Sequence, residues 1–166
     1  MALCIVAVKG EGIDRETLDI LVGKFGAKDF FSPEEAKFVA DDEPTAQDRI
    51  NFTWRYECLW GLLWALGYVD KLGRPDAICD ARKTVSFLTH LDPEKFIKES
   101  KLRPLSDILD QADLIYRYDW AIVDARVKGL DSPAGLDSGV VRERHHTFNW
   151  LIGYLEQDWD DIRTDT

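Results

Sequence analysis

The fold is decided by one apolar stretch of the chain, Phe52-Thr-Trp-Arg-Tyr-Glu-Cys-Leu-Trp-Gly-Leu-Leu-Trp-Ala-Leu-Gly-Tyr-Val69. Only Arg55 and Glu57 are charged among these 18 residues. The large apolar side chains surround the whole circumference of a helix, whereas a surface helix would show one polar face. We therefore expect a buried central helix over about Thr45–Val69.

Helix start signals stand on both sides of this stretch. Asp14 and Ser32 are placed as N-caps, and Ser32 can form a capping box with Glu35. Asp80 and Asp92 can each begin a short helix after the central one. These signals predict short helices before and after the central helix.

Two long helices are expected in the last third of the chain. One runs from Ser106 to about Lys128, and the other, capped by Asp137, covers Ser138–Glu156. The side chains expected to face the core are Leu109, Ala112, Ile115 or Tyr116, Trp120, Val123 and Val127 in the first helix, and Val141, Phe148, Leu151, Ile152 and Leu155 in the second.

The chain as a whole is expected to be all-α, a single-domain helical bundle over residues 1–166. The first apolar run, Ala2–Val8, is closed by Gly10 and Gly12 and is too short for periodicity to separate helix from strand.

Composition limits the classes of partner. The chain has 21 basic and 31 acidic residues, a formal net charge of −10. This balance argues against nucleic acid and anionic membranes as partners, since both need clustered lysine and arginine, and it permits a protein partner. Three widely spaced cysteines give neither a disulfide framework nor a metal motif. We expect a soluble cytoplasmic protein without a cofactor, and its oligomeric state is open.

Charged residues within apolar patterns are the candidates for a site. Arg55 and Glu57 lie about 200° apart on a helix, so each needs a partner elsewhere. Structural ion pairs are the favoured interpretation, and a pocket is the alternative. The candidate polar pocket consists of Arg55, Glu57, Asp119, Asp124, Arg142, Glu143 and His146.

The segment Arg142-Glu-Arg-His-His146 contains one E-x-x-H step, from Glu143 to His146. Carboxylate-bridged di-iron bundles repeat that step on two helices, and here it occurs once, so no metal is expected. His145 shares a helix face with Val141 and Phe148, which favours a hydrogen-bonded core histidine.

The C-terminal tail is both acidic and aromatic. We expect Trp159 to dock against the domain, with Asp158 or Asp160 accepting hydrogen bonds. Arg142 and Arg144 are candidates to face the acidic tail.

Several long motifs resemble the bacterial domain-of-unknown-function family 4272. They are Trp54-Arg-Tyr-Glu57, Leu62-Leu-Trp-Ala-Leu-Gly67, Tyr116-Arg-Tyr-Asp-Trp-Ala121, Glu143-Arg-His-His146, Phe148-Asn-Trp-Leu151 and Asp158-Trp-Asp through Thr164-Asp-Thr166. The resemblance covers roughly Thr45 to the C-terminus, and the front more weakly. It implies an all-helical fold with Ala2–Val8 helical and further residues upstream, and it supplies no activity. Asp119 stands where the resemblance would place a histidine.

The expected function is a non-catalytic protein-interaction module, of immunity type or an accessory factor, with an acidic surface. The alternative is an enzyme with a polar or metal-binding pocket formed by Arg55, Glu57, Asp119, Glu143 and His146. No nucleophile, phosphate-loop or dinucleotide motif is present.

Overall fold

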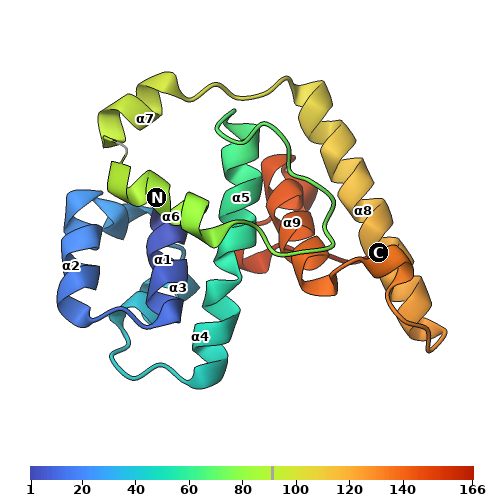
Figure 1. Ribbon diagram of the computed structural model, residues 1–166, viewed down its shortest axis with the longest axis horizontal. Coiled ribbons are helices and arrows are strands. Elements are labelled where there is room, and N and C mark those ends of the chain that lie inside the picture. Colours follow the sequence, from blue (N-terminus) through green and yellow to red (C-terminus); the bar gives the residue numbers. More distant parts are fainter. Residues whose placement is uncertain (91) are drawn as a thin grey trace. The chain divides into compact units, whose positions relative to one another are not determined.

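The computed structural model describes residues 1–90 and 92–166, without the side chains of residues 87–90. These residues form helices and their connections, with no strand among them, which confirms the all-α class (Figure 1). The α-helices are α1 (Ala2–Glu11), α2 (Arg15–Lys24), α3 (Pro33–Ala40), α4 (Ala46–Thr53), α5 (Arg55–Ala65), α6 (Ala81–His90), α7 (Pro93–Glu99), α8 (Leu105–Val127) and α9 (Ser138–Leu151). Short 3₁₀ turns cover Ala27–Phe30, Pro133–Gly135, Tyr154–Glu156 and Trp159–Asp161. In the described part of the chain, no helix has both the length and the apolar character needed to cross a bilayer.

The chain divides into two compact units. Unit 1 consists of Met1–Leu59 and Asp80–Glu99, and unit 2 consists of Trp60–Cys79 and Ser100–Thr166. The boundary between Leu59 and Trp60 falls inside α5. That residues 1–166 form one domain stays a prediction.

Helix α1 is the core of unit 1. Seven consecutive residues, from Cys4 to Gly10, are buried, and α2, α3, α4 and α6 pack around them (Figure 1). Burial raises the pKa of the Cys4 thiol to about 12. Gly10 lies inside the helix, where a Cβ would sit 2.8 Å from the Arg49 carbonyl oxygen and 2.9 Å from the Thr53 nitrogen. The absence of a side chain at Gly10 therefore lets α4 approach the backbone of α1. Helix α1 continues past Gly10 and ends at its C-cap residue, Gly12.

The predicted N-caps are confirmed. The side chains of Asp14, Ser32, Asp80, Asp92 and Asp137 each accept a hydrogen bond from a backbone N–H two or three residues ahead, at 2.8–3.2 Å. The capping box predicted between Ser32 and Glu35 is complete. Hydrogen bonds from the Thr17 N–H and hydroxyl hold the pKa of Asp14 below its ordinary value.

The predicted central helix is wrong in length, because the structure has two helices there. The break falls at Trp54, between α4 and α5. None of the α4 residues is buried, and its polar side chains follow a surface pattern. Helix α5, in contrast, is buried from Tyr56 to Gly61 and from Leu63 to Ala65. The prediction of a helix buried on all sides is therefore correct only for α5.

Unit 2 is built on the pairing of α8 with α9 (Figure 1). Its segment of α5 also packs closely on α9, since a Cβ on Gly61 would lie 3.0 Å from the Cγ2 atom of Thr147. Trp64 meets Phe148 edge to face, with ring centroids 5.7 Å apart.

The predicted core face of α8 is right at Ala112 and Ile115 and wrong at the positions that are exposed. The buried side chains are those of Ile108, Ala112, Ile115, Asp119, Ile122 and Ala125. The first five follow a 4-3-4-3 spacing, which is that of a helix-pairing seam. Leu109, Tyr116, Trp120 and Val127 are exposed. This helix has two apolar stripes. The charged Asp119 interrupts the buried one, so the hydrophobic pattern of the sequence does not identify the buried stripe.

Helix α9 is shorter than predicted. It ends at Leu151, and Gly153 follows with a φ of 67°. Val141 and Phe148 are buried as expected, but Leu155 is exposed, so its predicted place in the core is wrong. The left-handed glycine turns the chain before the predicted end at Glu156.

Candidate functional site

A buried polar pair joins the two long helices of unit 2. His145 Nδ1 of α9 lies 2.9 Å from Asp119 Oδ2 of α8, and the side chains are 2% and 10% exposed. Tyr116 places the edge of its ring on the imidazole, with centroids 6.0 Å apart. The prediction of a hydrogen-bonded core histidine is thereby confirmed, and Asp119 is its partner.

An aspartate–histidine pair can serve as a general base when its imidazole reaches a substrate. Here the imidazole is almost fully excluded from solvent, which favours a structural role. The aspartate lies at a seam position of α8, where it is hydrogen-bonded to His145, as buried polar groups require.

The predicted pocket residues fall in both units. Arg55 and Glu57 belong to unit 1. Arg55 Nε lies 3.8 Å from Glu35 Oε1, so its partner is elsewhere in the chain, as expected from the helical spacing. Glu57 is 1% exposed. Asp119, Asp124, Arg142, Glu143 and His146 belong to unit 2. Their joint action as a pocket stays a prediction.

Within unit 2, ion pairs separate several of these residues. Asp124 Oδ2 lies 2.7 Å from Lys128 Nζ on the outside of α8. Arg142 Nη2 lies 3.3 Å from the Oε1 atom of the adjacent Glu143. Arg117 pairs with Asp113 at 2.8 Å instead of reaching across to another helix. Among these charged residues of α8, Asp119 meets α9 through His145, whereas Asp113–Arg117 and Asp124–Lys128 are i,i+4 pairs on the α8 surface.

The tail residues contact α9. The Trp159 ring meets His146 and Trp150 edge to face, at centroid distances of 4.6 Å and 5.4 Å. Asn149 Nδ2 donates a hydrogen bond of 2.7 Å to the Arg163 carbonyl. Asp158 precedes the short turn Trp159–Asp161, and its carbonyl accepts from the N–H of Asp161. Asp160 is half-buried in the same turn.

We expect Trp159→Ala to lower the free energy of unfolding by about 1–2 kcal/mol, because the two ring contacts of a half-buried indole would be lost. Thermal unfolding measures the change. Leu114→Ala, at an exposed position of α8, is the control and should shift the midpoint less. If deletion of residues 158–166 left the unfolding midpoint unchanged, the tail would contribute nothing to the fold.

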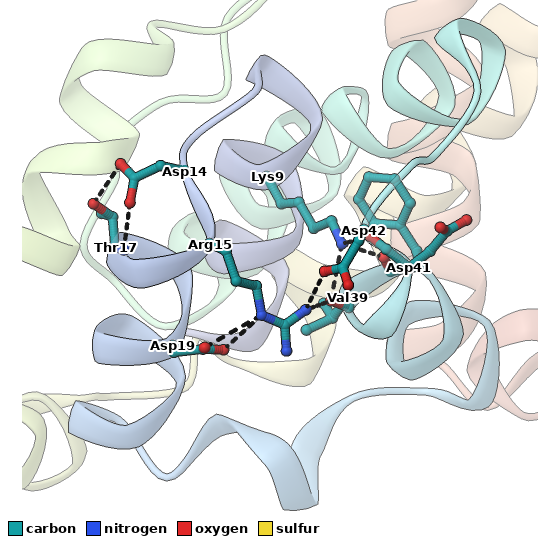
Figure 2. A network of polar contacts seen from close by, with 9 residues as sticks. Lys9, Asp14, Arg15, Thr17, Asp19, Val39, Asp41 and Asp42 are labelled. Atoms are coloured by element: carbon teal, nitrogen blue, oxygen red, sulfur yellow. Dashed lines mark hydrogen bonds and ion pairs between the residues drawn. The ribbon is translucent and has the colours of Figure 1, made fainter.

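Basic side chains that donate to backbone carbonyls are structural features that the sequence did not predict. Figure 2 shows Lys9 Nζ at the end of α3, where it donates to the carbonyls of Phe38, Val39 and Asp41 at 2.6, 2.8 and 2.5 Å. Burial lowers the pKa of Lys9. The exposed Arg15 adds a hydrogen bond to the Val39 carbonyl at 3.3 Å. The cations thus satisfy carbonyls at a helix C-terminus.

Arg103 does the same at the end of α5. Its Nε donates to the Trp64 carbonyl at 2.7 Å, and its Nη2 donates to the Val69 carbonyl at 3.0 Å. The guanidinium also lies 4.7 Å from the Trp64 ring centroid. Arg144 donates to the Gly73 carbonyl at 3.0 Å, and its predicted contact with the tail stays a prediction.

The outer face of α8 carries an apolar stripe. We use the name outer stripe for Leu105, Leu109, Tyr116, Trp120 and Val127, which are between 45% and 79% exposed. At about 100° per residue, all five fall within an arc of about 60°. Contiguous exposed apolar side chains of this kind mark interaction surfaces.

Among the side chains that the structure describes, no three from His, Cys, Asp or Glu are grouped to hold a metal ion. No curated protein and no solved structure matches the chain. Over residues 1–162 the chain matches the family described as "Domain of unknown function (DUF4272)", and the match spans both units. The resemblance noted in the motifs is thereby confirmed, and the chain belongs to the DUF4272 family.

Proposed function

We propose that the protein is a non-catalytic protein-binding module and that the outer stripe of α8 is its docking surface. The observation that carries this proposal is the exposure of Trp120 and Tyr116 on one line with three aliphatic side chains. Tryptophan and tyrosine are the side chains that most often dominate the binding energy of an interface. A role as an immunity-type or accessory factor in the cytoplasm belongs to the same proposal.

The charge of the chain and the Asp119–His145 pair support a binding role. A net charge of −10 disfavours nucleic acid and anionic lipid, and an apolar stripe fits a protein surface. The Asp119–His145 pair could serve as a general base, but it is excluded from solvent. A substrate would not reach it unless α8 and α9 separated. The binding energy would thus come from the stripe, with charge setting the choice of partner.

Site-specific photo-crosslinking tests the proposal. A benzophenone amino acid replaces Trp120 in the full chain, expressed in the native host. Leu114 is the matched control, because it is exposed on the same helix but lies about 120° or more from the outer stripe. We expect protein adducts from position 120 that position 114 does not give. Equal adducts from both positions, or none from position 120, would contradict the proposal.

A further inference from the structure

The outer stripe has a symmetry that points to one kind of partner. Its centre is Tyr116. Leu105 and Val127 lie eleven positions before and after it, and Leu109 and Val123 lie seven positions before and after it. Val123 is half-buried on the same line. Exposed Leu102 and Leu130 extend the series, fourteen positions away, just outside the two helix ends. Apart from Trp120, whose mirror position is Ala112, the series has aliphatic side chains at matching positions in both directions, which fits a second copy running antiparallel.

We infer that the outer stripe binds a second copy of this chain, with the two α8 helices antiparallel and Tyr116 on the twofold axis. This inference rests on the proposed function and names its partner.

The packing of the stripe agrees with this arrangement. With Tyr116 on the axis, Trp120 of one copy lies opposite position 112 of the other. There it faces a hole formed by Leu109, Ala112, Asp113 and Tyr116, in the manner of a knob entering a hole. Ala112 is buried in the α8 seam, so the indole would lie over the exposed side chains of Leu109, Asp113 and Tyr116.

The charges of α8 select the antiparallel direction. Asp107, Asp110 and Asp113 are the charged residues of its first half, and that half has no basic residue. The second half and the helix end carry Arg117, Arg126 and Lys128, together with the half-buried Asp124 and the buried Asp119. An antiparallel pair sets the acidic half of one copy beside the basic half of the other. A parallel pair would set aspartates beside aspartates, which costs affinity.

Sedimentation equilibrium tests self-association of the full chain at physiological salt, where the long-range repulsion between two acidic chains is largely screened. We expect the mass to rise from 19.0 kDa towards twice that value with concentration. Trp120→Glu should weaken the association by roughly tenfold or more, as expected for a central aromatic residue. Leu114→Glu, with the same charge change off the stripe, should leave it unchanged. A single species of 19.0 kDa at every concentration would overturn the inference.

Cysteine crosslinking tests the direction. In a Cys79→Ser background, Leu105→Cys and Val127→Cys chains carry tags of different size. The antiparallel pair predicts a disulfide between the two kinds of chain when they are mixed under mild oxidation. Each kind alone would crosslink only in a parallel pair, and that result would overturn the inference.

The photo-crosslinks separate this inference from the proposed function. Adducts from position 120 that contain only a different polypeptide would refute self-association and leave the docking surface standing. Absence of adducts together with a monomeric chain would refute both.

Discussion

Lys9→Met is expected to destabilise the protein by about 3 kcal/mol or more. The substitution keeps an unbranched apolar stem in the core of unit 1 but removes the ammonium that donates to three carbonyls. A buried acceptor that loses its donor costs about 1–3 kcal/mol, and Lys9 is 5% exposed, so water does not readily replace the ammonium. Thermal unfolding should show a midpoint lower by about 6–12 °C.

The matched control is Lys24→Met. Lys24 is an exposed lysine in the last turn of α2, so the change in charge and in side-chain shape is the same. We expect a change within about 0.5 kcal/mol for this surface position. Equal losses for the two variants would mean that Lys9 acts through net charge, and the three hydrogen bonds at the end of α3 would carry no special weight.

The Lys9 site shows which kind of contact cannot be predicted from the sequence. N-caps were predicted correctly at Asp14, Ser32 and Asp137 because each of these residues bonds to a backbone N–H two or three positions ahead. Lys9 and Arg103 cap helix C-termini that lie about 30 or more residues away in the chain. No local pattern encodes such a contact, since any basic residue beside an apolar run could make it.

The error at α8 has a different cause. The helix carries two apolar lines, and the one with Trp120 and Tyr116 has the larger side chains, so the sequence predicts most of the core face on that line. Burial follows the other line, with Ile115 and Ile122, where Asp119 interrupts the apolar pattern. The carboxylate is tolerated there because His145 meets it from α9, and a pairing across two helices is invisible in one sequence.

The candidate site was predicted in part for the same reason. His145 was identified as a core histidine from its own helix face, which needs only local spacing. The sequence places its partner Asp119 in the candidate pocket and does not pair it with His145, and the resemblance to the family marks that position without giving it a role. The outer stripe became a candidate surface only once its side chains were found exposed.

Asp119→Leu is expected to lower the free energy of unfolding by about 3–5 kcal/mol, the usual cost of removing one partner of a buried polar pair. Leucine would complete the apolar seam of α8, so packing alone predicts a gain. The loss arises because His145 is left without its acceptor in an environment that excludes water. The double variant Asp119→Leu, His145→Phe removes both partners and should recover much of the loss, and chemical denaturation of the four proteins gives the coupling energy.

Asp124→Leu is the matched control, because it makes the same substitution on the same helix at a surface pair. Asp124 bonds to Lys128 with its side chain 36% exposed, and such pairs contribute about 0.2–1 kcal/mol. The two substitutions therefore separate the burial of a carboxylate from its mere presence on α8. If Asp119→Leu matched the control, or if the double variant were as unstable as the sum of its single changes, then the Asp119–His145 pair would not couple the helices. The pairing of α8 with α9 would in that case depend on Ile108, Ile115 and Ile122 alone.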